Sequence, residues 1–270
     1  MLGRFIILSL TAYRAYSHKS LSKSGIFIAI VTGIIHALAD SALELTLLVV
    51  FFVVGSLATK YKHDLKSKYT KVLGNGSDDT TRSYIQVLSN SFVATLLILG
   101  SLLTLIPTRF AQVGTIVNYC AVTADTLSSE IGILSQETPV LCYNWSAHVP
   151  RGTNGAISRL GLWAGFCGSF LIALVSAAYL KFGWKQLIFF TVSGVIGSLI
   201  DSFLGAFCQL SLLDSDLQVV VEGAQGERLA KDLPGTKPIS GADLLSNNAV
   251  NLLMSAITTF LFAFLIDYLH

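Results

Sequence analysis

The sequence predicts an all-α, polytopic integral membrane protein. It should be a helical bundle of seven or eight spans in which residues 1–270 form a single transmembrane domain, with one longer cytosolic loop near residues 207–248. The composition is the first reason: 53% of the residues are hydrophobic and only 13% are charged, whereas a soluble domain carries about 25% charged residues. The second is a mean hydropathy of +0.66. A net charge of +2 is too small to suggest a nucleic-acid partner.

The apolar residues gather in runs close to the length of a membrane span, which needs about 20 residues. The candidate runs are residues 3–14, 25–39, 43–58, 91–106, 111–127, 160–180, 186–206 and 249–267. The first run is short, so the count is seven or eight. Residues 25–58 cannot form one helix, because at 1.5 Å per residue they would reach ~50 Å, beyond the ~30 Å hydrocarbon core. A turn is therefore expected near residues 39–42.

The basic residues predict how the chain is oriented. If the loops alternate sides, 14 of the 18 Lys and Arg residues fall on one side, in loops 14–24, 59–90, 128–159 and 207–248. Such an excess marks the cytosolic side, and we expect the working face there because all the long loops share it. The sequons at Asn75 and Asn144 lie in these loops, so neither should be glycosylated. In the last loop, Gly223 and Gly226 predict a hairpin turn.

Two carboxylates lie in the apolar stretch NYCAVTADTLSSEIGIL, residues 118–134. Asp125 and Glu130 are the only charged residues between Ala111 and Leu134. An ionisable residue inside a membrane costs roughly 2.5–3.5 kcal/mol, so it is normally kept only where it faces a bundle interior or a water-filled cavity. The two acids are separated by about 140° around an ideal helix and do not share a face. They converge only if the helix ends or unwinds between them, and the alternative is a wet loop at the membrane edge.

Other polar residues follow single faces of the apolar segments. Asp201 shares a face with Gly194, Gly197 and Gly205, and such a small-residue face lets another helix approach closely. Two further stripes have helical spacing, one formed by Arg82, Gln86 and Asn90 and the other by Asn248, Asn251 and Ser255. Helix packing and interhelical hydrogen bonds are the alternative explanation for each stripe.

The segment VPRGTNGAIS directly precedes the apolar run 160–180. Its Arg151, Gly152, Asn154 and Gly155 are typical of a loop whose N–H groups bind a phosphate, aided by the start of the following helix. The basic run that begins at Lys60 lies on the same side of the membrane. Attraction of that run to anionic lipid head groups is the alternative.

Five motifs together resemble the transmembrane protein 19 family, which includes the plant phytyl-phosphate kinase. They are RSYIQVLSNS, YCAVTADTLSSEIGILS, VPRGTNGAISRLG, GSLIDSFLGAFCQ and ISGADLLSNNAVNLL. The resemblance runs in order from about Leu21 to the C-terminus. The departures fall at apolar or small positions, Ser91, Leu127 and Ala156, while the polar positions of the motifs match.

The resemblance implies a membrane kinase that converts an isoprenyl monophosphate to the diphosphate with a nucleoside triphosphate, CTP being the favoured donor. The acceptor phosphate is already ionised near pH 7, so the reaction mainly requires positioning and charge neutralisation by Mg²⁺ and basic side chains. We hypothesise that the carboxylates bind Mg²⁺ and that basic side chains, amide side chains and the glycines of the RGTNG loop bind the phosphates. The carboxylates are Asp125, Glu130 and Asp201, and the phosphate-binding residues are Lys60, Arg82, Asn90, Arg151, Gly152, Asn154, Gly155, Asn248 and Asn251.

The expected partners are membrane lipids, the isoprenyl phosphate and the nucleotide, and the expected location is the endoplasmic reticulum or another endomembrane. Two other functions remain open: a transporter or channel-like protein that uses the same acids as an ion or substrate site, and a lipid-binding protein without chemistry. The depth of the acids in the membrane separates a kinase from a transporter. Kinase acids should lie toward the head groups on one face, and transporter acids should lie near the midplane.

Overall fold

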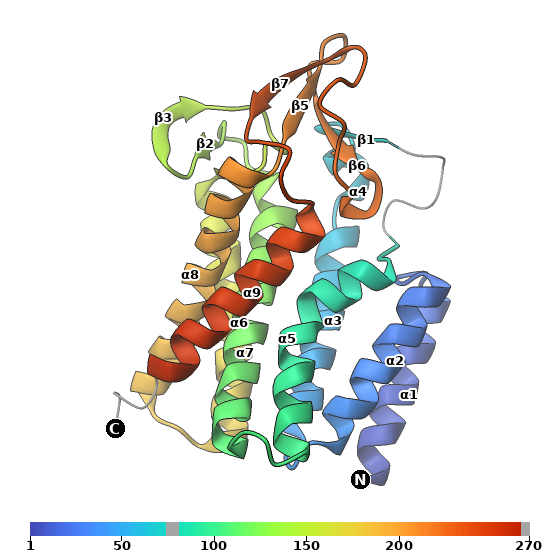
Figure 1. The fold of residues 1–270 in the computed structure, drawn as a ribbon, viewed down its shortest axis with the longest axis vertical. Helices are drawn as coiled ribbons and strands as arrows, with labels where there is room; N and C mark the ends of the chain where they lie inside the picture. The colour runs from blue at the N-terminus through green and yellow to red at the C-terminus, as the bar shows by residue number, and fades with distance from the viewer. Residues whose placement is uncertain (74–80, 266–270) are drawn as a thin grey trace.

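The computed structural model describes residues 1–73 and 81–265, and most of them are helical (Figure 1). Asn75, one of the two sequons, lies outside the described residues. The helices are α1 Leu2–Ser17, α2 Lys23–Leu38, α3 Leu43–Lys60, α4 His63–Lys66, α5 Tyr84–Leu102, α6 Thr108–Gly132, α7 Arg159–Leu180, α8 Trp184–Cys208 and α9 Asn247–Leu265. Each predicted apolar run overlaps one of the long helices, and the chain turns at residues 39–42 as expected.

Five helices of the described chain are long and apolar enough to cross a membrane: α3, α5, α7, α8 and α9. The predicted number of seven or eight spans is not reached by this measure. Helix α2 is apolar but has only 16 residues. Helix α6 has 25 residues, but its polar side chains keep it out of this group even though it lies at the centre of the bundle.

Helix α6 is central because small residues let its neighbours pack directly on its backbone. A Cβ atom at Gly165 would lie 3.1 Å from the carbonyl oxygen of Ala124, and one at Gly194 would lie 2.6 Å from that of Cys120. The predicted small-residue face of α8 is thus confirmed as a helix interface. Lipid tails are as apolar as these side chains, so close packing of this kind is what holds membrane helices together.

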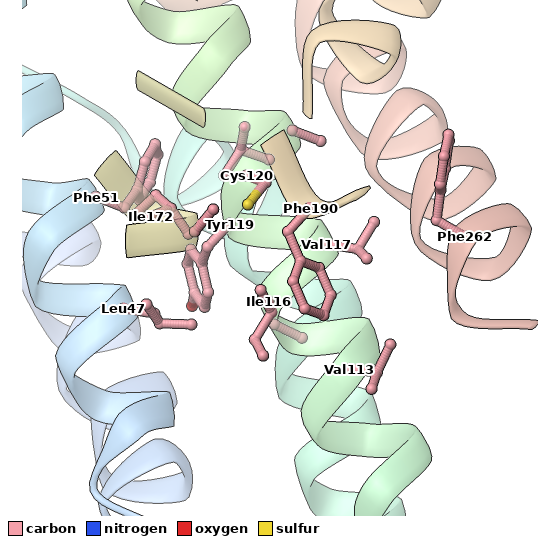
Figure 2. Packing of buried hydrophobic residues seen from close by; sticks show 14 of the residues in the cluster. Leu47, Phe51, Val113, Ile116, Val117, Tyr119, Cys120, Ile172, Phe190 and Phe262 are labelled. Atoms are coloured by element: carbon pink, nitrogen blue, oxygen red, sulfur yellow. The ribbon is translucent and has the colours of Figure 1, made fainter. Parts of the chain in front are cut away.

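The main apolar core surrounds the middle of α6 (Figure 2). Tyr119 is fully buried, and its hydroxyl lies 2.7 Å from Nε2 of His36. Phe51, Ile172 and Phe190 bring α3, α7 and α8 into the same cluster. This core fixes the half of the bundle that lies farther from the long loops.

The long loops carry two small β-sheets, so the all-α prediction is incomplete although the bundle itself is helical. One sheet has the order β1-β6-β5-β7, and the other has the order β3-β2-β4. The strands are β1 Thr70–Leu73, β2 Val140–Leu141, β3 Asn144–His148, β4 Ala156–Ile157, β5 Ser211–Asp214, β6 Val220–Gly223 and β7 Thr236–Ser240. The four-stranded sheet joins loop 59–90 to loop 207–248, because β1 of the first loop pairs in parallel with β6 of the second.

The predicted hairpin turn at Gly223 and Gly226 is wrong. Strand β6 ends at Gly223, and residues Ala224–Gly226 form a 3₁₀ turn. The hairpin instead joins β5 to β6, with Leu213 paired to Val220. Pairing with β1, which is remote in sequence, fixes β6, and the local glycine pattern carries no information about that partner.

The four basic loops meet at one end of the bundle (Figure 1). Residues 14–24 contact residues 59–90, since Arg82 N donates to Ser20 O at 3.1 Å and Ser22 N donates to Arg82 O at 3.0 Å. Residues 59–90 in turn meet residues 207–248 through an ion pair of 2.7 Å between Lys71 Nζ and Asp214 Oδ2. We call this end of the bundle the loop face.

We expect impermeant thiol reagents to modify a cysteine at Ser67 or Ser146 from one side of the membrane and a cysteine at Thr104 from the other. The first two positions are exposed on the loop face, and Thr104 is exposed in the turn between α5 and α6 at the opposite end. The background should carry Cys167→Ser, because Cys167 is exposed. Labelling of Ser67→Cys and Ser146→Cys from opposite sides, or a glycan on Asn144, would contradict a single loop face.

Candidate functional site

A polar cavity of about 670 Å³ opens at the loop face. Its wall is built from the ends of α3, α5, α6, α8 and α9, from α4, β1 and β6, and from the loop that carries RGTNG. Of the twelve residues expected from the sequence, ten line it: Arg82, Asn90, Asp125, Glu130, Arg151, Gly152, Asn154, Gly155, Asp201 and Asn251. Segments far apart in the chain therefore bring the polar motifs into one chamber.

Two carboxylates from different helices meet at the floor of this cavity. Asp125 of α6 and Asp201 of α8 are close enough to interact electrostatically, and Ser198 hydrogen-bonds to Asp125. In the orientation that satisfies its neighbours, the Asn251 amide donates to Asp201 Oδ2 at 3.0 Å. Neither carboxyl group forms an ion pair with a described Lys or Arg side chain, so the two acids face each other without a basic partner.

Helix α6 does not unwind between Asp125 and Glu130, contrary to the sequence expectation. It runs unbroken to Gly132, because backbone contacts with α7 support it there: a Cβ atom at Gly161 would lie 2.9 Å from the Ser128 carbonyl oxygen. Both acids still line the cavity, but from different sides of the helix. The alternative of a wet loop is also wrong, since both acids are helical.

Glu130 belongs to a separate ionic cluster. Its Oε2 forms an ion pair of 2.6 Å with Lys66 Nζ, and its Oε1 accepts from Thr59 Oγ1 at 2.7 Å. Lys66 also donates to the carbonyl oxygen of Ala58 at 2.6 Å. In the described part of the chain no group of three or more Asp, Glu, His or Cys side chains is arranged to hold a metal ion. The three predicted metal ligands therefore separate into an Asp125–Asp201 pair and a basic-paired Glu130.

Arg82 continues this cluster along the cavity wall. Its Nη2 donates to Thr59 Oγ1 at 3.2 Å, and its guanidinium lies 5.9 Å from the centre of the Phe51 ring. Gly55 makes room for it, since a Cβ atom there would lie 3.1 Å from Nη2. Burial lowers the pKa of the Arg82 guanidinium, and the charge of nearby Glu130 opposes that shift.

The RGTNG loop has the backbone shape that its glycines predict. Gly152 and Gly155 have φ angles of +87° and +76°, values that favour glycine. Several of its N–H groups are already used within the protein, since Thr153 N donates to Pro150 O and Asn154 N donates to Ser211 Oγ at 3.0 Å. The loop is thus tied to β5 and packed on α8, which makes it a brace of the cavity wall.

The remaining predicted phosphate ligands divide into two groups. Arg151 lies in the cavity wall, with its guanidinium 4.3 Å from the centre of the Tyr69 ring, and Asn90 lines the cavity from α5. Lys60 and Asn248 are absent from the wall. Lys60 is exposed and donates to the His18 carbonyl oxygen, while Asn248 donates to Gln225 O at 2.9 Å and holds the 3₁₀ turn.

Lys66 is a charged cavity residue that the sequence did not single out. It is one of five lysines between residues 60 and 71, and composition alone does not separate them. The left-handed backbone of Lys62, with φ +50°, begins the one-turn helix α4 and turns Lys66 inward until its side chain is only 9% exposed. No periodicity in the sequence marks that turn.

We expect Lys66→Met to lower the stability of the protein by about 2–3 kcal/mol. Breaking a buried ion pair by removing one partner costs roughly 3–5 kcal/mol, and the 24% exposure of the Glu130 side chain reduces that cost. The measurement is the thermal midpoint in detergent, with Lys68→Met as the exposed lysine control. Adding Glu130→Gln should recover part of the loss, and equal midpoints for the two lysine variants would rule the pair out as a structural contact.

The chain matches the family described as integral membrane protein DUF92 over residues 6–259. It is 34% identical over 282 residues to Protein PGR of Arabidopsis thaliana, an alignment that covers 95% of this chain and 92% of that protein. The uncharacterized membrane protein MJ0933 of Methanocaldococcus jannaschii is 34% identical over 202 residues, covering 74% of this chain and 80% of that protein.

A third relative, Protein VTE6, chloroplastic, of Arabidopsis thaliana, is 28% identical over 214 residues, covering 78% of this chain and 64% of that protein. No solved structure matches the chain. The matches confirm the resemblance to the transmembrane protein 19 family that the five motifs indicated. The chain belongs to the DUF92 family of integral membrane proteins.

Proposed function

We propose that the protein is a membrane kinase that phosphorylates an isoprenyl monophosphate to the diphosphate, using a nucleoside triphosphate, with CTP as the favoured donor. The observation that carries the proposal is the Asp125–Asp201 pair on the floor of a cavity whose wall also holds Lys66, Arg82 and Arg151. In the reaction an oxygen of the acceptor phosphate forms a bond to the γ-phosphorus, the bond from that phosphorus to the bridging oxygen breaks, and the nucleoside diphosphate leaves.

The residues present fit a Mg²⁺ ion at the carboxylate pair. Mg²⁺ is commonly bound by one or two carboxylates together with substrate phosphates, and Asp125 and Asp201 supply two carboxylates that lack a basic partner in the described chain. When bound, the ion neutralises charge on the transferring phosphoryl group. Ser198 and Asn251 orient the two carboxylates, and Glu130, engaged with Lys66, takes no part in this set.

The basic side chains neutralise the remaining phosphate charge. Arg82 and Arg151 both line the cavity, one in the Thr59–Glu130 cluster and the other over the ring of Tyr69. An arginine presents several N–H donors in a fixed plane, which suits phosphate oxygens. The acceptor needs no general base, because a phosphate monoester is already ionised near neutral pH.

The depth of the acids favours a kinase over a transporter. Asp125 and Asp201 each lie seven residues before the end of a 25-residue helix, which is about 10 Å inside the loop end of the bundle at 1.5 Å per residue. Both acids therefore lie in the half of the bundle next to the loop face, and the cavity reaches the loops. Transporter sites lie near the midplane, at the interface between internal repeats.

The proposal is tested with the purified protein in lipid nanodiscs. Isoprenyl monophosphates of several chain lengths are supplied with CTP, ATP, GTP or UTP and Mg²⁺, and the products are analysed by mass spectrometry. The expected product is the isoprenyl diphosphate, formed in an amount equal to the nucleoside diphosphate released. Nucleotide hydrolysis without lipid product, or no turnover with any donor, would overturn the proposal.

We propose that the protein acts in an internal membrane, the endoplasmic reticulum or another endomembrane. The relative VTE6 is named as chloroplastic, so plastid membranes are the competing location. Fractionation of cells that express the tagged full-length chain separates the two, and co-purification with plastid membranes would contradict the endomembrane location.

A further inference from the structure

A second hollow lies beside the polar cavity, between α1, α2, α3 and α5. It is a narrow groove of about 60 Å³, and its lining is almost entirely apolar. Leu8 and Ala12 line it from α1, Ile26 and Ala29 from α2, and Phe52 from α3. Figure 1 shows α1 and α2 at the edge of the bundle opposite α8.

Two residues belong to both hollows. Arg82 and Gln86 line the polar cavity on one side and the apolar groove on the other. The Arg82 guanidinium donates to Thr59, which lines the cavity, and lies over the ring of Phe51, which lines the groove. The positive charge of Arg82 therefore lies where the apolar groove meets the polar cavity.

The groove follows the direction of the membrane-spanning helices. It includes residues from Leu8 to Ala15 on α1 and from Leu45 to Phe52 on α3, a length of about 10 Å along each helix at 1.5 Å per residue. It extends from Arg82 toward the opposite end of the bundle. Small side chains at Ala12, Ala15 and Ala29 leave the space.

We infer that this groove binds the hydrocarbon chain of the lipid phosphate whose head group enters the cavity beside Arg82. The inference rests on the proposed function and adds the place of the acceptor chain. An isoprenyl phosphate has an apolar chain, which matches the groove, and an anionic head group, which matches the cavity beside Arg82. Because the groove holds only about 60 Å³, the chain lies along it with one side against the bilayer.

The first test fills the groove with Ala29→Phe and compares it with Ala178→Phe, at an exposed position of α7 that lines neither hollow. We expect Ala29→Phe to raise KM for a long-chain isoprenyl monophosphate about tenfold and to leave KM for the five-carbon dimethylallyl monophosphate unchanged. Ala178→Phe should match the wild type for both substrates. Ala12→Phe repeats the test on the facing helix if Ala29→Phe fails to fold, and a chain-length profile equal to that of Ala178→Phe would overturn the inference.

The second test does not depend on activity and so separates this inference from the proposed function. A long-chain isoprenyl monophosphate with a photoreactive group at its tail is bound to the wild-type protein and irradiated, and the labelled peptides are identified. Labels on α1, α2, α3 and α5 that unlabelled isoprenyl phosphate removes, but phosphatidylcholine does not, support the groove even if no kinase activity is found. Labels spread over α7 and α8, or removed equally by phosphatidylcholine, make the groove a site for bulk lipid and contradict the inference.

Discussion

Asp201→Asn should lower the rate of phosphoryl transfer by about 10²–10³-fold, the usual loss when one preorganised electrostatic contact to the transition state is removed. The same variant should melt at an equal or higher temperature than the wild type. Asp125 and Asp201 are two carboxyl groups held close together in the bundle, so replacing one of them by an amide removes the repulsion that arises when both are ionised. Activity and stability should therefore change in opposite directions, as expected for a site that is strained for function.

Asp125→Asn should behave in the same way, and the double variant should be no slower than either single variant. Residues that act through one bound group lose their effect together, so their losses do not add. Asp216→Asn is the matched control, since Asp216 is an exposed acid on the loop face. Unchanged turnover in both Asp125→Asn and Asp201→Asn would remove the carboxylate pair from the mechanism.

Gly155→Val should lower the stability of the protein by about 2–4 kcal/mol. The left-handed backbone angle at this position costs a branched residue roughly 1–2 kcal/mol, and overpacking against the neighbouring helix costs a similar amount. The side chain would meet α8 directly, because a Cβ atom at Gly155 lies 2.5 Å from Ser202 O and 2.6 Å from the Cα of Ala206. Ser202 follows Asp201, so the same collision should displace the carboxylate pair and reduce transfer more than it reduces nucleotide binding.

Arg159→Ala is the control for Gly155→Val. Its side chain is 86% exposed and its contact with Glu137 is 3.6 Å long, and an exposed ion pair of this kind contributes little. Both variants should be measured at matched expression, by thermal midpoint and by KM and kcat. Normal kinetics and a normal midpoint for Gly155→Val would show that RGTNG is a simple turn with no influence on the cavity.

The membrane fold could be predicted from the sequence because the apolar runs and the basic loops are local signals. Ten of the twelve expected site residues line the cavity. Five of them, Asn90, Asp125, Glu130, Asp201 and Asn251, are polar side chains of the bundle helices, and such side chains have few stable places other than a shared interior. The small-residue face around Asp201 also identified a real interface. Those predictions depended on spacing within one segment.

The errors arose where distant segments decide the outcome. The strand pairing of β1 with β6 joins residues about 150 positions apart, and no local pattern encodes it. The sequence predicts Glu130 as a metal ligand, because nothing near it in the chain reveals its ion-pair partner Lys66, which comes from a different loop. Lys60 and not Lys66 is predicted from the sequence as a phosphate ligand, because charge alone does not show which lysine a one-turn helix directs inward.

Binding of Mn²⁺ in place of Mg²⁺ tests the central claim most directly, because it reports the metal at the carboxylate pair without requiring turnover. The purified protein is titrated with Mn²⁺ in the presence of a non-hydrolysable CTP analogue, and free Mn²⁺ is measured by electron paramagnetic resonance. We expect the wild type and Asp216→Asn to bind the ion when nucleotide is present. The double variant that carries both Asp125→Asn and Asp201→Asn should lose that binding. Equal Mn²⁺ binding by the wild type and the double variant would contradict a metal site at Asp125 and Asp201.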